Sequence, residues 1–459
     1  MKRNLRLIGS CDASTGSIDR RYGPIRPARI VLALVLTVGL LLTTPRETVA
    51  QNEPERAEMA DESQRGDTET WLNLRPYVLD LWGPRAGIGA GLGLVVNEAF
   101  AESDEFLLTV APALHERVYT LSYASGGTPP HGEQDHRVLL VSARHAYTTR
   151  DWFYGFGPAS APTARTAFTL RTFQGSARLG QHVLGDRLFL QAHGRVEHYR
   201  LTDANLPNPG DATAEDQPAV TAAAAYGATA VPLRTTGAVL GLDAQYDRRD
   251  RAYQTLRGVL LQGTAERWIP VGGTTFSFFR TDLGIHAWIP ITGSHRIALH
   301  GRIARLIDIN GVDDLSGRLP HIVTPVVDGR QVPGFLRDRY TGNDAVVLGA
   351  AYEFPITNIL AFNVEGYAGV QAASVYDDVT TQFELAFDSS TRISPDRDTY
   401  PLRPAASIGL RVGPQFRDQS YVDVAVGVGP DGLSAARISF VQRLNRARPP
   451  HHASNRWRR

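Results

Sequence analysis

Side chains that could catalyse a reaction or bind a metal are scattered along this sequence. Histidines such as His193, His286 and His300 could act as general bases or metal ligands, but the 13 histidines do not cluster at the spacing of a metal site. A G-x-S-x-G segment, which would present a nucleophilic serine, is absent from the sequence. We therefore predict that the protein is not an enzyme and has no catalytic residue, no metal and no cofactor.

Composition excludes further classes of protein. Lys and Arg total 48 against 47 Asp and Glu, which gives a formal net charge of +1. A general nucleic-acid binder would carry a marked excess of basic residues, so we expect no nucleic acid as a partner. Hydrophobic residues make up 42% and charged residues 21%, proportions that fit neither a bundle of membrane helices nor a disordered chain.

The N-terminus has the pattern of a secretory signal peptide, which we place at residues 1–50. Arginines precede an apolar run at residues 30–43, and a small-residue cleavage site ends at Ala50. The alternative is a membrane anchor, but a span needs about 20 apolar residues and the run is shorter. Cleavage would remove Cys11, the only cysteine, as suits a protein of an oxidising compartment.

The remaining sequence divides into three parts. Residues 51–70 are acidic and without periodicity, so we expect a flexible periplasmic leader. Residues 71–444 consist of short alternating segments separated by Gly, Pro, Asp and Asn, which is the pattern of β-strands. Residues 445–459 form a basic tail, which we expect to be disordered.

The alternating segments predict an all-β fold: a single closed antiparallel transmembrane β-barrel. A soluble sandwich would also alternate, but here the polar face carries charges in strand after strand, and strands of about ten residues match a tilted bilayer crossing. A closed barrel pairs every backbone donor in lipid. We count about sixteen strands. The longest connections follow odd strands and are therefore expected to be external; they are residues 200–237, 307–343 and 372–403.

Four segments resemble motifs of the bacterial surface antigen superfamily, which includes BamA and TamA. They are DWFYGFG at 151–157, YDRRDRAYQTLRG at 246–258, the loop at 332–339 with its alternating strand 344–356, and the region 408–440. The resemblance implies an outer-membrane barrel. Residues 51–70 leave no room for the periplasmic POTRA modules of full members, so the sequence looks like the short POTRA-less branch.

The resemblance also implies a role for the loop 307–343. In the family this loop folds into the lumen, and an arginine before a Gly-Phe pair contacts acidic residues on the inner wall. This sequence has Pro333 at that position, so Arg337 or Arg339 could make the contact, with Glu365 as the partner, or Tyr367 if the alignment shifts by two residues. The alternative is that both arginines are solvated. The candidate loop motif is therefore Val332, Pro333, Gly334, Phe335, Arg337 and Arg339.

Three functions remain open at this stage. The resemblance implies a protein of the bacterial outer membrane that assists the insertion or assembly of proteins or lipids. The alternatives are a passive pore or a structural surface protein. Expected partners are outer-membrane lipids and a periplasmic delivery protein or assembly machinery, and the sequence leaves the oligomeric state open.

Overall fold

The structure is a computed structural model. The expected signal peptide, leader and tail lie outside the residues that it describes, as do parts of the loops 200–237 and 307–343. All described residues belong to one unit, 48–459. They are 72–78, 81–82, 90–97, 104–112, 116–125, 137–162, 166–184, 187–203, 234–250, 255–272, 277–308, 323–359, 362–390, 393–394, 397–414, 420–434 and 437–442.

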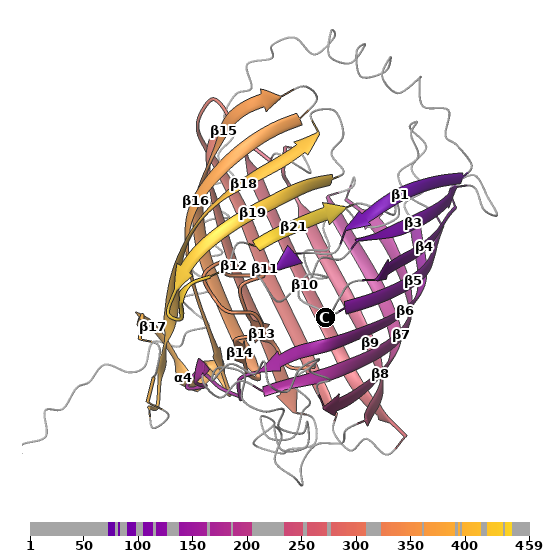
Figure 1. Cartoon of the computed structure of the whole chain (residues 1–459), viewed down its shortest axis with the longest axis horizontal. Helices are drawn as coiled ribbons and strands as arrows, with labels where there is room; N and C mark the ends of the chain where they lie inside the picture. The colour runs from indigo at the N-terminus through magenta and orange to yellow at the C-terminus, as the bar shows by residue number, and fades with distance from the viewer. Residues whose placement is uncertain are drawn as a thin grey trace, which may run out of the picture. The chain divides into compact units, whose positions relative to one another are not determined.

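A single large sheet dominates the described chain (Figure 1). Its 19 strands are β1 (Leu72–Val78), β2 (Leu81–Trp82), β3 (Ala90–Asn97), β4 (Glu105–Pro112), β5 (Glu116–Ser125), β6 (Arg137–Phe153), β7 (Thr166–Val183), β8 (Leu188–Asp203), β9 (Arg234–Asp247), β10 (Gly258–Val271), β11 (Phe278–Thr292), β12 (His295–Asp308), β15 (Asp344–Ile359), β16 (Phe362–Tyr376), β17 (Phe383–Phe387), β18 (Tyr400–Pro414), β19 (Ser420–Gly429), β20 (Gly432–Leu433) and β21 (Arg437–Gln442). A separate pair is formed by β13 (Val326–Val327) and β14 (Tyr340–Thr341), and α4 spans Val379–Gln382.

Neighbouring strands of the large sheet are antiparallel, with the exception of β17, which runs parallel to β18. The sixteen predicted strands are 72–82, 87–97, 105–115, 117–124, 137–147, 168–178, 186–199, 238–246, 256–268, 275–290, 295–306, 344–356, 360–371, 404–413, 418–428 and 433–443, and each overlaps a strand of this sheet. The structure has three more strands because the first and last segments are each divided in two, as β1–β2 and β20–β21, and because β17 forms inside the predicted external connection 372–403. Among the described helices, none has both the length and the apolar character needed to cross a membrane.

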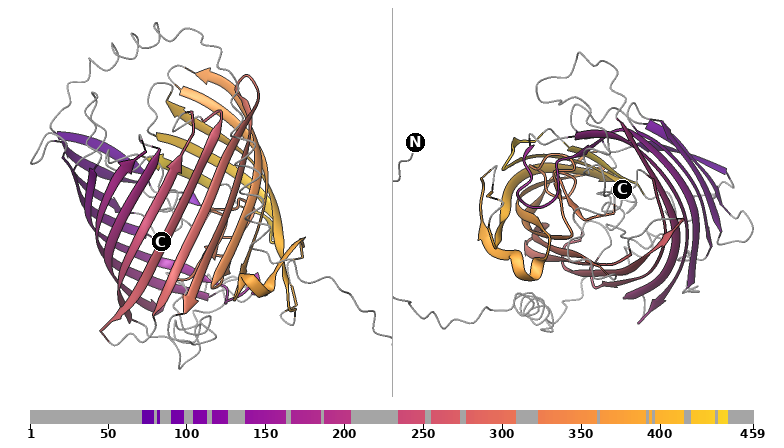
Figure 2. Two further views of the ribbon diagram at one scale, coloured as in Figure 1. Left: turned by 180° about the vertical axis from the view of Figure 1, so that it is seen from behind. Right: turned by 90° about the horizontal axis from the view of Figure 1, so that it is seen from below.

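The prediction of a closed barrel is not confirmed. The sheet curls strongly when seen from below (Figure 2), but β1 pairs with β3, and β21 pairs with β19. In the described part of the chain, only two residue pairs join the ends of the sheet: Leu81 with Ile438 and Trp82 with Arg437. Within the described residues, β2 has two residues and β21 has six, and these lengths limit the pairing between them.

The two faces of the sheet have opposite chemistry. On β8 the outward side chains Leu190 and Val196 are 44% and 51% exposed, whereas the inward Gln191 and Glu197 are 3% and 6% exposed. Ile408 on β18 is likewise exposed, and its inward neighbour Ser407 is buried. This is the reverse of a soluble protein and matches a sheet that faces lipid on its outside.

Candidate functional site: the inner loop and the charged wall

Residues 323–343, here called the inner loop, pack against the inner face of the sheet. Val332 and Phe335 are fully buried in a cluster with residues of β15, β16 and β18. Close contact is possible because the facing wall is made of glycine: a Cβ atom added at Gly427 would lie 2.3 Å from the carbonyl carbon of Pro333. Gly334 adopts a φ of +113°, a conformation that side chains rarely adopt. The Val-Pro-Gly-Phe motif is therefore held by its backbone as well as by its side chains.

Two buried carboxylates organise the inner loop from within. Arg330 donates to Asp328 at 2.8 Å and to Asp338 at 2.7 Å, and both aspartates are fully enclosed. Burial lowers the pKa of Arg330, but the two carboxylates outweigh it and raise the pKa above its ordinary value. Arg330 consequently stays charged, and the loop keeps a fixed shape between β13 and β14.

Arg339 connects the inner loop to two other parts of the chain. Its guanidinium donates to Asp431 Oδ2 at 2.9 Å, in the turn between β19 and β20. It also donates to Ser160 Oγ at 3.0 Å and to Ser160 O at 2.9 Å, and it lies over the ring of Tyr340, 4.2 Å from the centroid. Arg339 is 0% exposed, so these are charge-assisted contacts in a site without water access.

A second buried arginine, Arg403, lies on β18. Arg403 donates to Pro158 O at 2.7 Å and to Ser390 O at 2.8 Å, and it also contacts the ring of Tyr340. Burial raises the pKa of Tyr340, although both arginines oppose the shift. Together with the bond from Gly157 N to Thr341 O, 2.8 Å long, these contacts join segment 151–162, the inner loop, Ser390 and the start of β18 into one assembly.

An alternating row of charges lines the inner wall beyond the inner loop. Glu353 on β15 accepts from Arg296 on β12 and from Arg411 on β18, each at 2.6 Å. Arg296 also donates to Glu365 on β16 at 2.8 Å. Glu353 is 3% exposed, and cations on both sides compensate its burial.

The row continues to the last strand. Asp423 on β19 accepts from Arg411 at 3.1 Å, from Tyr367 at 3.0 Å and from Arg437 on β21 at 2.8 Å. Arg437 also donates to the backbone oxygen of Arg330 at 2.7 Å. One side chain of β21 therefore binds both the wall and the inner loop. We call the set Arg296, Glu353, Glu365, Tyr367, Arg411, Asp423 and Arg437 the wall network.

A third cluster lies on β8, β9 and β10, and sequence reasoning missed it. The two ring nitrogens of His193 lie 2.9 Å from Asp243 Oδ2 and 2.9 Å from Glu266 Oε1. Arg195 donates to Glu266 and Glu197. Among the described residues, no group of His, Cys, Asp or Glu is arranged to hold a metal ion. His193 is thus one member of an ion cluster on the inner wall.

The predicted pairing of Glu365 with an arginine of the loop is not seen. Arg337 contacts its neighbour Asp338 at 3.3 Å, Arg339 contacts Asp431, and Glu365 contacts Arg296. The reason is position: Glu365 is near the hairpin that joins β15 to β16, whereas the loop enters from the opposite end of β15. The alternative partner Tyr367 contacts Asp423 instead.

The true partners of Arg339 gave little signal in the sequence. Asp431 stands in Gly-Pro-Asp-Gly, which reads as an ordinary turn. Ser160 follows the aromatic segment 151–157, and nothing in its own sequence context indicates a buried contact. Contacts between residues so distant in sequence depend on how the strands curl, and a single sequence does not show this.

An apolar outer face, a charged inner face and a connection packed against that inner face are features of outer-membrane proteins built on a curled antiparallel sheet. A family profile described as "Omp85 superfamily domain" matches residues 119–417. The chain belongs to the Omp85 superfamily and is a protein of the bacterial outer membrane.

Several solved structures have a similar fold. BamA from Haemophilus ducreyi lacking POTRA domains 1-3 matches with a TM-score of 0.53 and 13% identity, over 87% of this chain and 80% of that one. CdiB from Escherichia coli gives 0.53 and 12% over 82% and 63%, and CdiB from Acinetobacter baumannii gives 0.50 and 14% over 82% and 60%. The chain thus spans less than two thirds of either CdiB. No curated protein matches it.

Proposed function

We propose that this protein assists the insertion or passage of polypeptides or lipids at the outer membrane, acting without catalysis and with a periplasmic protein that delivers its client. Membership of the Omp85 superfamily supports this class of role. The observation that carries the proposal is the weak seam between the ends of the sheet, where, among the residues that the structure describes, two residue pairs join β2 to β21. By comparison, β10 and β11 are joined by eleven pairs, from Gly258 to Trp268.

Because so few pairs between described residues hold the seam, we infer that the wall opens there at the lowest free energy. An opened seam exposes strand edges to lipid, where unpaired backbone groups cost several kcal/mol each. A client strand that pairs with those edges removes that cost, which gives the site an affinity for polypeptide.

The inner loop supports the proposal from a second direction. Its burial against β15, β16 and β18 argues against a wide passive pore, because the space beside these strands is occupied by protein. We propose that the loop 307–343, through its motif at 332–339, blocks the interior and steadies the strands next to the seam.

A disulfide across the seam tests the main proposal. Cysteines replacing Leu81 and Ile438, in a Cys11→Ser background, would lock the seam. The matched control replaces Leu179 and Ala192, which are paired on β7 and β8 and are both exposed. In a strain that depends on this gene, oxidation of the seam pair is expected to lower the amounts of several unrelated outer-membrane proteins, and reduction to restore them. Normal amounts in the locked strain would refute the proposal.

Conductance measurements distinguish a passive pore from a protein whose interior is blocked by the inner loop. Planar-bilayer recordings should show low conductance for the intact chain and a clear increase on deletion of 330–340. A large, stable conductance that survives the deletion unchanged would show that the inner loop does not block the interior.

A further inference from the structure

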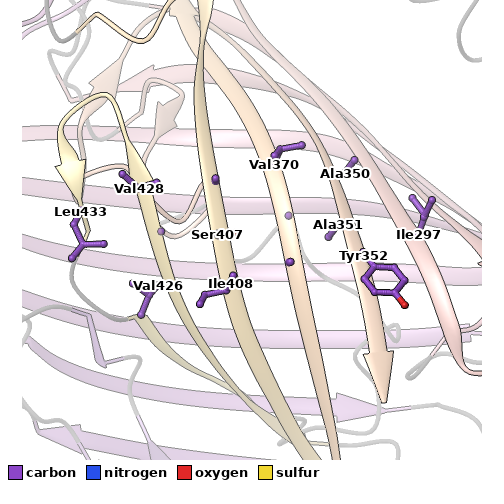
Figure 3. A pocket seen from close by; sticks show the side chains of 14 residues that line it. Ile297, Ala350, Ala351, Tyr352, Val370, Ser407, Ile408, Val426, Val428 and Leu433 are labelled. Carbon is purple, nitrogen blue, oxygen red and sulfur yellow. The ribbon is translucent and has the colours of Figure 1, made fainter. Parts of the chain in front are cut away.

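The outer face of the sheet has a hollow over β12, β15, β16, β18 and β19 (Figure 3). Its volume is about 620 Å³. The hollow exists because three outward positions carry alanine: Ala350, Ala368 and Ala406. Each alanine is paired on the neighbouring strands with bulky residues, whose side chains form a raised rim around it. The rim consists of Ile297, Tyr352, Val370, Ile408, Val426, Val428 and Leu433.

The rim residues project away from the sheet. Val370 is 63% exposed, Ile408 is 66% exposed and Leu433 is 75% exposed. Water would fill such a hollow in a soluble protein. On a protein of the outer membrane, this face meets hydrocarbon, so an empty hollow would lose the dispersion contacts that a smooth surface makes with lipid tails.

One end of the hollow carries a pair of polar side chains. The hydroxyl of Tyr352 lies 2.5 Å from Nδ1 of His295, and His295 directly follows the short turn 293–294 at the end of β11. That turn follows an even strand in the sequence-based count and is therefore expected to be periplasmic. Tyrosine is enriched at membrane–water interfaces, and this enrichment fits an interfacial position for the pair.

We propose that this hollow binds an acyl chain of a phospholipid from the periplasmic leaflet, with the headgroup beside Tyr352 and His295. The apolar rim favours binding of a hydrocarbon chain, and the Tyr352–His295 pair can form hydrogen bonds with the polar headgroup of the ligand. This inference goes beyond the proposed function, because a lipid site is independent of whether the seam opens.

The hollow has a second consequence, because the same wall carries the inner loop on its other side. Gly427 lines the hollow, and from inside it touches Pro333 so closely that a Cβ atom would not fit. Ala405 also contacts the loop at Gly334, and its neighbour Ala406 lies in the hollow. A lipid outside and the Val-Pro-Gly-Phe motif inside thus pack on opposite faces of one thin patch of β18 and β19.

Filling the hollow tests the proposal. Ala368→Trp places an indole over the floor, and Ala244→Trp makes the same change on β9, where the side chain is also exposed but lies outside the hollow. Each protein is reconstituted in vesicles of palmitoyl-oleoyl phosphatidylethanolamine and phosphatidylglycerol, extracted gently and weighed by native mass spectrometry. We expect the wild type and Ala244→Trp to retain a bound phospholipid and Ala368→Trp to lose it. Equal retention by all three proteins, or by none, would overturn the proposal.

Two further measurements keep the test decisive. Heat-modifiable mobility on a gel reports whether Ala368→Trp is folded, and if it is not, the smaller change Ala406→Leu takes its place. A cysteine at position 370 would form a covalent dimer on oxidation if a second copy covered the hollow, and that result would also overturn the lipid assignment.

Discussion

Replacing Arg339 by methionine removes the charge that joins the inner loop to the turn between β19 and β20. Methionine keeps much of the length of the side chain but cannot donate to Asp431 or to Ser160, which lie 2.9–3.0 Å from the guanidinium. The side chain of Asp431 is only 2% exposed, so its carboxylate would lose its cation in a place that water does not reach.

The expected cost follows from that geometry. Removing one partner of a buried ion pair costs about 3–5 kcal/mol, because the other charge stays buried without compensation. Arg337→Met is the matched control: its side chain is 24% exposed, and Asp338 keeps a second cation in Arg330. We expect the control to cost no more than about 1 kcal/mol.

Both costs can be measured by denaturant unfolding of the refolded proteins in detergent, followed by tryptophan fluorescence. The comparison is valid when the unfolding free energies of the variants fall with denaturant concentration at the same slope. A double variant, Arg339→Met with Asp431→Asn, should cost less than the sum of the single changes by about 0.5–3 kcal/mol. Equal costs for Arg337→Met and Arg339→Met, or strict additivity in the double variant, would refute the assignment of Arg339 as the buried anchor.

Three other changes test separate parts of the structure. Gly427→Ala should expose the inner loop to protease, because the new methyl group collides with the backbone of Pro333, whereas Gly284→Ala, where the nearest atom lies 4.0 Å away, should leave the cleavage rate unchanged. Glu266→Gln should lower the free energy of unfolding by about 3 kcal/mol or more, because it leaves buried cations of its cluster uncompensated; an effect no larger than that of an exposed carboxylate would contradict this. Burial raises the pKa of Asp378, but its hydrogen bonds at the start of α4 outweigh burial and hold the pKa below its usual value. The contribution of Asp378 to stability is therefore present above the unfolded pKa and is lost as pH falls through the folded pKa. Proteolysis within 377–390 should increase on acidification in the wild type more than in Asp378→Asn.

Much of the wall was predictable from the sequence because strands leave a local signal. The alternation of Val422, Val424, Val426 and Val428 with small or polar residues indicates β19 directly, and the same logic located segments overlapping each main strand. The polarity of the two faces was predictable as well, since parity assigns each side chain to one face.

The contacts of the inner loop were not predictable in the same way. Arg339 meets Asp431, which is 92 residues away, and Ser160, which is 179 residues away. Such pairs depend on the curl of the sheet and on the direction in which the loop enters. Closure of the sheet was also not predictable, since alternation predicts that a strand exists but not that the first and last strands of the sheet pair along their full length.

The wall network has a consequence for how the chain reaches its folded arrangement. Arg296 is directly opposite Glu353, and Arg411 is directly opposite Asp423, on adjacent strands. A slip of one residue along either ladder would turn a charged side chain from the protected inner face toward lipid, at a cost of about 2–4 kcal/mol for an arginine at the middle of the bilayer. These ion pairs therefore lower the free energy of the correct strand register relative to a register shifted by one residue, and they favour correct pairing while the sheet enters the membrane.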